Sequence, residues 1–359
     1  ARNLSEFAAL ISPEATSHLE DMAQHSQRIT QRQFGKTIRL FAPLYLSNEC
    51  VNVCKYCGFS RHNSIPRLTI SVEQAVEQAR KLSRQGYRSL LLVAGEHPKY
   101  VHNGYVANVI ERLLPVTPDL NIELGPMDTV EYEPIIHAGC EGLIAYQETY
   151  HQPTYEDLHT AGPKRFYHWR LDTVERGYAA GFRKLGIGAL FGLYDWRYEA
   201  MHVAAHALYL QKHCWKAQIT ISLPRMRPAS GGYQPHEAYR MSDRQLVQTI
   251  CAFRMLVPSA GIILSTREPS YLRNGLVPLG ITQMSAGSST EPGGYRHFDE
   301  TTWQAEEDQP GEQFEIADER SPADIAEMIR QHGYDPVWKD FDEAFVKEPS
   351  QPALTSETI

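Results

Sequence analysis

The stretch that decides the fold reads Leu46-Ser-Asn-Glu-Cys50-Val-Asn-Val-Cys54-Lys-Tyr-Cys57-Gly-Phe59, with the cysteine spacing C-x3-C-x2-C. Three thiolates on one loop can hold three irons of a [4Fe–4S] cluster, and the fourth iron then stays open to a small chelating molecule. Zinc is the competing interpretation. A structural zinc site needs four ligands, and His62 is the only nearby candidate for the fourth. We therefore expect an iron–sulfur cluster on Cys50, Cys54 and Cys57.

Strand-like and helix-like segments alternate along the chain around this stretch. Eight β-rich segments are expected, at residues 38–47, 89–94, 121–124, 142–146, 185–190, 218–223, 261–265 and 280–285. Helical patterns lie between them, at residues 72–85, 105–114, 131–137, 166–180, 199–212 and 243–256. Alternation of this kind indicates a parallel sheet, and eight such units favour a closed (β/α)8 barrel of the TIM type. An open, doubly wound sheet is the alternative.

The barrel pattern leaves a segment at each end of the chain. We expect an N-terminal helical extension over residues 1–34, the barrel over 35–290, and a C-terminal loop, helix and tail over 291–359. The acidic, Gly- and Pro-containing stretch 291–318 reads as a loop or mobile segment. A helix over 323–331 and an aromatic tail follow, and the residues from about 349 onward are expected to be disordered.

Composition excludes several classes of protein. The net charge is −8 and the calculated pI is 6.0, and no Lys/Arg run forms a nucleic-acid footprint. The apolar runs are too short to span a bilayer, and the first residues lack the apolar stretch of a signal peptide. The other three cysteines, Cys140, Cys214 and Cys251, lie in apolar or helical stretches and are expected to be small buried hydrophobes. We expect a soluble, cytoplasmic protein that binds neither nucleic acid nor a membrane.

Polar residues follow the predicted strands, where barrel chemistry gathers. Glu96 follows the second strand within Gly95-Glu96-His97, and a turn with a solvated acid is the competing interpretation. Glu148 follows the fourth strand, and Arg170 lies in the next helix. A buried ion pair between Glu148 and Arg170 is as well supported by the sequence as a functional role.

The later strands end in glycine, arginine and serine. Gly188 lies within the fifth strand, where a glycine serves either strand packing or close approach of a flat ligand such as adenine. Arg225 and Arg227 follow the sixth strand, and surface ion pairs are the simpler interpretation for both. Arg267 follows the seventh strand, beside the Ser/Gly-rich stretch that begins at Ser285, and there an arginine suits a carboxylate ligand.

The cysteine triplet, with Tyr56 just before its third cysteine, resembles the radical S-adenosylmethionine (SAM) superfamily. This resemblance implies a site-differentiated [4Fe–4S] cluster whose open iron chelates the methionine part of SAM. It also implies that a 5′-deoxyadenosyl radical abstracts hydrogen from a small substrate. On the same grounds, SAM-binding roles are expected for Tyr56, Glu96, Glu148 and Arg170, and Gly188 is the expected neighbour of the adenine.

A closer resemblance, from about residue 35 to residue 345, is to the aromatic amino-acid lyases of that superfamily. It rests on Phe41-Ala-Pro-Leu-Tyr-Leu-Ser-Asn, Leu92-Val-Ala-Gly-Glu-His, Tyr146-Gln-Glu-Thr-Tyr-His, Pro224-Arg-Met-Arg-Pro and Leu264-Ser-Thr-Arg-Glu. Three groups compete: the tyrosine lyases of thiamin thiazole synthesis (2-iminoacetate synthases), the tyrosine lyases that mature [FeFe]-hydrogenase, and tryptophan lyases. The maturases carry a second, C-terminal cluster. No cysteine follows Cys251 here, and the tail from Asp335 is similar to that of the thiamin enzymes, so the first group is favoured.

The resemblance implies a reaction. The radical would take hydrogen from the amino nitrogen of L-tyrosine, and Cα–Cβ cleavage would give 2-iminoacetate (dehydroglycine) and p-cresol. Arg267 and Ser285 would hold the carboxylate and amine of tyrosine. The expected partners are a thiazole synthase that receives the unstable product, and an electron donor such as flavodoxin or ferredoxin. A non-catalytic, metal-bearing assembly protein is the alternative from another class.

Overall fold

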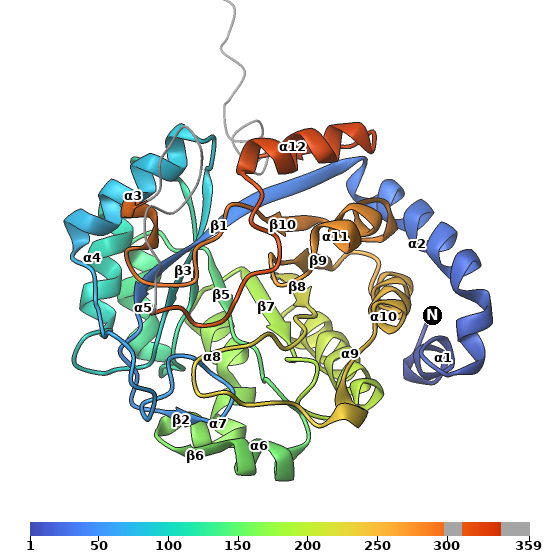
Figure 1. The fold of residues 1–359 in the computed structure, drawn as a ribbon, viewed down its shortest axis with the longest axis horizontal. Helices are drawn as coiled ribbons and strands as arrows, with labels where there is room; N and C mark the ends of the chain where they lie inside the picture. The colour runs from blue at the N-terminus through green and yellow to red at the C-terminus, as the bar shows by residue number, and fades with distance from the viewer. Residues whose placement is uncertain (298–310, 339–359) are drawn as a thin grey trace, which may run out of the picture.

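Eight parallel strands form a closed barrel in the computed structural model, which describes residues 1–297 and 311–338 (Figure 1). In the order of their pairing they are β1 (Thr37–Ser47), β3 (Ser89–Ala94), β4 (Asp119–Glu123), β5 (Gly142–Ile144), β7 (Lys184–Gly188), β8 (Gln218–Ser222), β9 (Gly261–Leu264) and β10 (Gln283–Ser285). The barrel closes where β10 pairs with β1, with Phe41 opposite Ser285. The predicted (β/α)8 architecture is therefore confirmed, and the open sheet is excluded.

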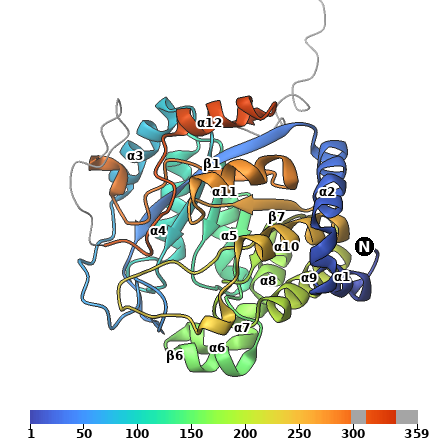
Figure 2. The same cartoon turned by 45° about the vertical axis from the view of Figure 1, so that its right-hand side comes forward.

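Helices surround the strands (Figures 1 and 2). They are α3 (Val72–Arg84), α4 (Asn103–Leu113), α5 (Thr129–His137), α7 (Tyr167–Leu171), α8 (Thr173–Ala180), α9 (Trp196–His213), α10 (Asp243–Leu256) and α11 (Ser270–Leu276). Ser71 and Ser242 begin α3 and α10 with capping boxes, which satisfy the first free amide groups of each helix. Helix α3 buries Ala75, Ala79 and Leu82, so its apolar stripe faces the barrel.

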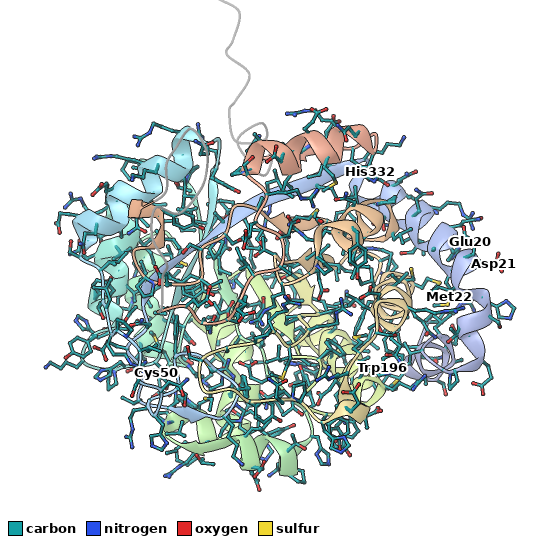
Figure 3. The ribbon with its side chains drawn as sticks, in the orientation of Figure 1. Glu20, Asp21, Met22, Cys50, Trp196 and His332 are labelled. Carbon is teal, nitrogen blue, oxygen red and sulfur yellow. The ribbon has the colours of Figure 1, made fainter. Side chains whose placement is uncertain are left out.

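The N-terminal helices pack on the outside of the barrel. They comprise α1 (Leu4–Leu10), the 3-10 turn η1 (Glu14–His18) and α2 (Leu19–Phe34). The rings of Phe7 and Phe253 of α10 lie 4.9 Å apart, and Gln248 Nε2 donates to the carbonyl oxygens of Leu10 and Ser12, each at 2.9 Å. Figure 3 places Met22 of α2 and Cys50 on opposite sides of the molecule. The predicted helical extension is thus present, and it lies far from the cysteine loop.

The structure differs from the prediction between β5 and α8. Three short elements were not expected there: α6 (Gln152–Leu158), β6 (His159–Ala161) and the 3-10 turn η2 (Pro163–Arg165). The helix expected over residues 166–180 is two helices, because the chain breaks from helical geometry near Asp172. Strand β6 pairs antiparallel with β2 (Val53–Cys54) of the cysteine loop. Strands of two or three residues show no readable periodicity, which is why this pair was missed.

Residues 311–318, which we call the mouth strap, cross the carboxyl ends of the barrel strands. Gly58 N donates to Gln313 O at 3.1 Å, Glu315 N donates to Pro228 O at 3.0 Å, and Ala317 N donates to Thr266 O at 2.8 Å. The mouth strap is therefore a loop that is packed against the barrel, so of the two interpretations, a loop or a mobile segment, the structure shows the first for residues 311–318. Residues 298–310 of that expectation lie outside the described residues, as do the tail residues from 349 onward.

The strap is followed by α12 (Pro322–Gln331) and by β11 (Asp335–Val337), which pairs parallel with the start of β1. The Trp338 ring packs edge-on against Tyr87, with ring centroids 5.1 Å apart. The domain boundaries at residues 34/35 and 290/291 stay predictions. Within residues 1–297 and 311–338, we find no helix with the length and apolar character that crossing a membrane requires.

Candidate active site

A cavity opens at the carboxyl ends of the strands, under the mouth strap. It encloses about 990 Å³ of empty space, including its open mouth. Its wall brings together Cys57, Tyr56 and Glu148 from one side of the barrel with Arg267 and Ser285 from the other. Eight of the predicted site residues therefore lie at the same end of the barrel as this cavity, since Cys50, Cys54 and Arg170 pack against residues of its wall. This is the end of a (β/α)8 barrel at which active sites form.

The three cysteines lie on the loop after β1. Cys54 is buried, and Cys50 and Cys57 are partly buried. Burial raises the pKa of the Cys54 and Cys57 thiols. A bound metal offsets that effect, because it stabilises the thiolate form directly. Among the described residues, no three His, Cys, Asp or Glu side chains converge on a single metal-ion position. Each thiolate of a [4Fe–4S] cluster binds its own iron, so convergence on one point is not what such a cluster requires.

Amide groups support the thiols. Asn52 Nδ2 lies 3.7 Å from Cys50 Sγ, and Gln313 Nε2 of the mouth strap lies 4.0 Å from Cys57 Sγ. Both are N–H donors to sulfur, which suits thiolate ligands. Gly95 allows the end of β3 to approach the loop, because a Cβ there would lie 2.4 Å from Glu49 O and 3.1 Å from Cys50 Cβ. The donor set and this close packing fit a thiolate-held cluster.

Asn52 also connects the cysteine loop to Glu96. Its Nδ2 donates to Glu96 Oε2 at 2.7 Å, and its Oδ1 accepts from the Lys164 amide at 2.9 Å. Gly125 makes room for Glu96, since a Cβ on that glycine would lie 2.4 Å from Glu96 Cγ. Glu96 is thus held beside Cys50, which is a position consistent with its predicted role.

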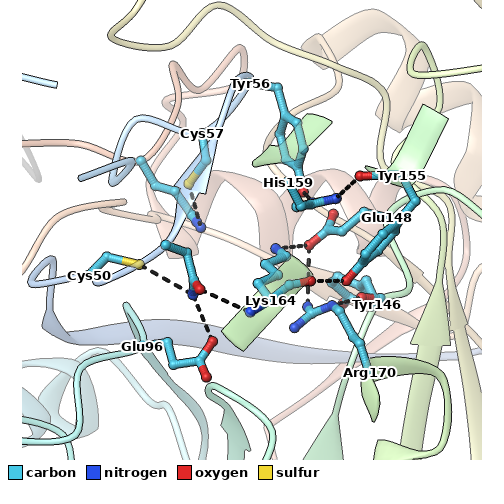
Figure 4. Close-up of polar contacts among 12 residues, drawn as sticks. Cys50, Tyr56, Cys57, Glu96, Tyr146, Glu148, Tyr155, His159, Lys164 and Arg170 are labelled. Carbon is cyan, nitrogen blue, oxygen red and sulfur yellow. Dashed lines mark hydrogen bonds and ion pairs between the residues drawn. The ribbon is translucent and has the colours of Figure 1, made fainter. Parts of the chain in front are cut away.

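Tyr56 is buried within the cysteine loop, and its hydroxyl lies 2.8 Å from His159 Nε2 (Figure 4). His159 Nδ1 lies 2.7 Å from Tyr155 O. Burial, together with the charge of Lys164, lowers the pKa of His159 to about 3, so the imidazole is neutral near pH 7. Lys164 Nζ lies 5.7 Å from the centroid of the Tyr56 ring. A ligand bound by Tyr56 would contact this ring.

Glu148 lies in a buried cluster with two cations (Figure 4). Its Oε1 is 2.7 Å from Lys164 Nζ and 3.3 Å from Arg170 Nη2. Burial alone would raise the pKa of Glu148, but the two cations outweigh it and lower the pKa to about 2. Arg170 is fixed by a second bond, from Nε to Tyr146 O at 2.7 Å. The expected Glu148–Arg170 ion pair is present, and Lys164 joins it.

The backbone at Glu148 is unusual. Its φ of 70° makes it the one non-glycine residue with positive φ in the described part of the chain. The following residues are held by Glu199, a buried carboxylate of α9 that accepts from the Thr149 hydroxyl and, at 2.8 Å, from the Tyr150 amide. Strained backbone of this kind persists where its surroundings hold it, and it is frequent at functional sites.

Gly188 is explained by packing. A Cβ on this residue would lie 2.3 Å from Ser222 O of β8 and 3.0 Å from Tyr146 Cδ1. The space above its Cα is therefore filled by the protein, and Gly188 is absent from the lining of the cavity. Contact between its backbone and adenine stays a prediction.

Arg267 lines the cavity with its guanidinium over the Phe314 ring, 3.3 Å from the centroid. Burial lowers the pKa of Arg267. No carboxylate of the described residues forms an ion pair with it, which leaves the guanidinium available to a ligand. Ser285 Oγ, also in the wall, accepts from the Thr266 amide at 3.1 Å and keeps its own proton to donate. These contacts are compatible with the predicted roles, which stay predictions.

The two arginines after β8 differ from each other. Arg225 forms ion pairs, with Glu268 through Nε at 3.1 Å and with Asp243 through Nη1 at 2.8 Å, but only Asp243 lies at the surface, where the pair was expected, because Glu268 is buried. Arg227 lines the cavity, and its buried Nε makes no hydrogen bond within the described residues. The ion-pair interpretation therefore holds for Arg225 alone.

Sequence reasoning missed Asn52, Glu123 and Lys164. Glu123 ends β4 in the cavity wall. Burial, together with the negative charge of Glu148, raises the pKa of Glu123 to about 7. The position of Glu123 at a strand end was a usable signal. Lys164 lies in the 3-10 turn η2 and Asn52 lies in the cysteine loop, and no local pattern indicates that these two segments meet.

Two family models match the chain. The model described as the radical SAM superfamily matches residues 44–204, and the one described as the biotin and thiamin synthesis associated domain matches residues 222–335. The first match contains the cysteine loop and the Glu148 cluster, and the second contains Arg267 and Ser285.

Curated relatives cover nearly the whole chain. The 2-iminoacetate synthase of Escherichia coli K12 is 42% identical over 338 residues, which are 94% of this chain and 87% of that protein. The 2-iminoacetate synthase of Salmonella typhimurium LT2 is 41% identical over the same shares. Among solved structures, the [FeFe]-hydrogenase maturase HydG of Carboxydothermus hydrogenoformans aligns with a TM-score of 0.85 and 35% identity, covering 94% of this chain and 76% of that one.

Proposed function

The chain belongs to the 2-iminoacetate synthases of the radical SAM superfamily, and on this premise we propose which of its residues cleave L-tyrosine into 2-iminoacetate and p-cresol. The enzyme is a lyase that uses a [4Fe–4S] cluster and SAM. The observation that carries the proposal is one cavity that has the cysteine loop on one wall and, on the other, Arg267, which forms no ion pair within the described residues.

When bound, the cluster and SAM supply a one-electron reductive cleavage that yields a carbon-centred radical able to take hydrogen from the substrate. Cys50, Cys54 and Cys57 would hold the cluster, with Asn52 and Gln313 donating to sulfur. Tyr56, Glu96, Glu148 and Arg170 would hold SAM. Lys164 neutralises Glu148, so this carboxylate is already paired within the protein.

Arg267 would bind the carboxylate of tyrosine, and Ser285 would donate to the same group. The Phe314 ring under the guanidinium restricts its motion, which lowers the entropy lost when the ligand binds. The mouth strap lies over the cavity, where it would limit the access of water, as a radical intermediate requires.

The partners belong to the proposal as well. 2-Iminoacetate hydrolyses readily, so transfer to a thiazole synthase is expected. A flavodoxin or ferredoxin would reduce the cluster. A thiolate-held cluster needs reducing conditions, so the proposal places the protein in a reducing compartment such as the cytoplasm.

Product analysis tests this function. The reconstituted, reduced protein is incubated with SAM and either L-tyrosine or L-tryptophan under anaerobic conditions, and the products are separated by chromatography. We expect p-cresol from tyrosine and no indole product from tryptophan. Cleavage of tryptophan in place of tyrosine would assign the chain to a different substrate.

A further inference from the structure

Of the two glutamates that line the cavity, only one is engaged by cations of the protein. Glu148 is bound by Lys164 at 2.7 Å and by Arg170 at 3.3 Å. Glu123 lines the same cavity from the end of β4, and its side chain forms no hydrogen bond or ion pair with any described residue. A partly buried carboxylate without a partner is costly to the folded protein, which favours a role toward a ligand.

The same cavity contains the opposite charge. Arg267 lines it and forms no ion pair within the described residues, and the charges of Glu123 and Arg267 influence each other's titration. A free amino acid carries one carboxylate and one ammonium. The pair of Arg267 and Glu123 matches both charges, whereas Ser285 is neutral and cannot match the ammonium.

We propose that Glu123 binds the ammonium group of the amino-acid substrate and accepts one of its protons. This inference rests on the function proposed above. Abstraction of a hydrogen atom from nitrogen requires a neutral amine, whose lone pair stabilises the nitrogen radical. In the step proposed here, one N–H bond of the ammonium breaks and its electron pair stays on nitrogen. The proton bonds to a Glu123 oxygen, and the carboxylate becomes a neutral acid.

The surroundings of Glu123 suit a proton acceptor that works near neutral pH. Burial and the charge of Glu148 raise the pKa of Glu123 to about 7, while three cations oppose this shift. A carboxylate with such a pKa is a stronger base than an ordinary glutamate. The titratable and charged groups that interact with it are Tyr45 of β1, Tyr146 and Glu148 after β5, Lys164 of η2, Arg170 of α7 and Arg267 after β9.

The test is a comparison of two ligands on two proteins. L-Tyrosine and 3-(4-hydroxyphenyl)propanoate, which lacks the amine, are bound to cluster-loaded protein with SAM but without reductant, and affinities are measured by calorimetry. For Glu123→Gln, we expect tyrosine affinity to fall about 10- to 100-fold, which is the range for loss of a charged hydrogen bond. Affinity for the propanoate should change less than about twofold, because that ligand makes no bond to Glu123.

Glu133→Gln is the matched control, because Glu133 is exposed on α5, the helix after β4. It should leave both affinities unchanged. A second readout is the pH profile. In the wild type, kcat/KM for p-cresol release should rise with pH through about 7, as Glu123 loses its proton, and Glu123→Gln should lack this limb.

If Glu123→Gln lost affinity equally for both ligands, Glu123 would have a structural role. If the variant bound tyrosine as tightly as the wild type, Glu123 would not belong to the substrate site. Either result overturns the inference. A wild-type protein that binds tyrosine yet releases no p-cresol would overturn the proposed function, while the two-ligand comparison would still decide the binding role of Glu123. A wild-type protein that does not bind tyrosine would overturn both.

Discussion

Lys164 is the residue that ties the cysteine loop to the Glu148 cluster. Its side chain binds Glu148, and its backbone amide binds Asn52, which contacts both Cys50 and Glu96. The side chains of Lys164 and Glu148 are 14% and 13% exposed, so solvent screens this ion pair weakly. One lysine thus joins the parts of the site expected to hold the cluster and SAM.

The variant Lys164→Gln should lower the free energy of unfolding by about 3 kcal/mol, because Glu148 would remain buried with Arg170 as its only cation. It should also weaken SAM binding. Anaerobic urea unfolding and equilibrium dialysis with SAM measure the two effects. Lys55→Gln is the control, since Lys55 pairs with Asp157 at the surface and should contribute less than about 1 kcal/mol. Equal effects of the two variants would show that the buried pair has no special importance.

At this scale the sequence identified the residues whose chemistry is local. The spacing of three cysteines within eight positions is enough to predict three thiolate ligands on one loop. Glu123 and Lys164 could not be identified in the same way, because they acquire their roles from neighbours far away in the chain. The same limit applies to the ion pair of Arg225 with Glu268, because these two residues follow different strands and meet only in the folded barrel.

Among the elements, the β2–β6 pair matters most for the site. It pairs Cys54 with His159 and brings the Tyr56 hydroxyl within hydrogen-bond distance of the His159 imidazole. The boundaries of β3 and α10 could be predicted to the residue, since a buried apolar run marks the strand and a capping box marks the helix start. The β2–β6 pair could not be predicted, because it is only two or three residues long and is stabilised by tertiary contacts.

The buried imidazole of β6 makes stability depend on pH. The pKa of His159 is about 3 in the folded protein, against about 6.5 in the unfolded chain. Between these values the unfolded chain binds a proton that the folded protein does not. His159 therefore contributes no penalty above pH 6.5, and it destabilises the fold progressively as the pH falls toward 3. At pH 5 the loss should be about 2 kcal/mol.

Urea unfolding of iron-free protein at pH 7 and pH 5 measures this loss. His159→Gln should reduce the difference between the two pH values by the same amount, whereas a change at the exposed His137 should not. An unchanged difference in His159→Gln would assign the acid sensitivity to other groups.

For the whole molecule, barrel closure is what brings the two walls of the site together. Pairing of β10 with β1 sets Ser285 beside Phe41. The end of the last strand therefore lies next to β1, the strand that leads into the cysteine loop. The buried Arg273–Asp318 pair then attaches the end of the mouth strap to the barrel, and Arg273 also donates to the Ser285 carbonyl. The eight-unit pattern predicted the closure of the barrel. The path of the mouth strap could not be predicted, because its sequence has no periodic pattern.

The central claim is that three thiolates of this barrel hold a cluster that starts the cleavage of tyrosine. It is tested most directly by the ratio of p-cresol to 5′-deoxyadenosine in a single anaerobic reaction. The reaction contains reduced wild-type protein loaded with about four irons per chain. We predict that both products form, in comparable amounts, and that Cys54→Ala forms neither. Formation of 5′-deoxyadenosine without p-cresol, or of neither product by a colourless, zinc-containing protein, would contradict the claim.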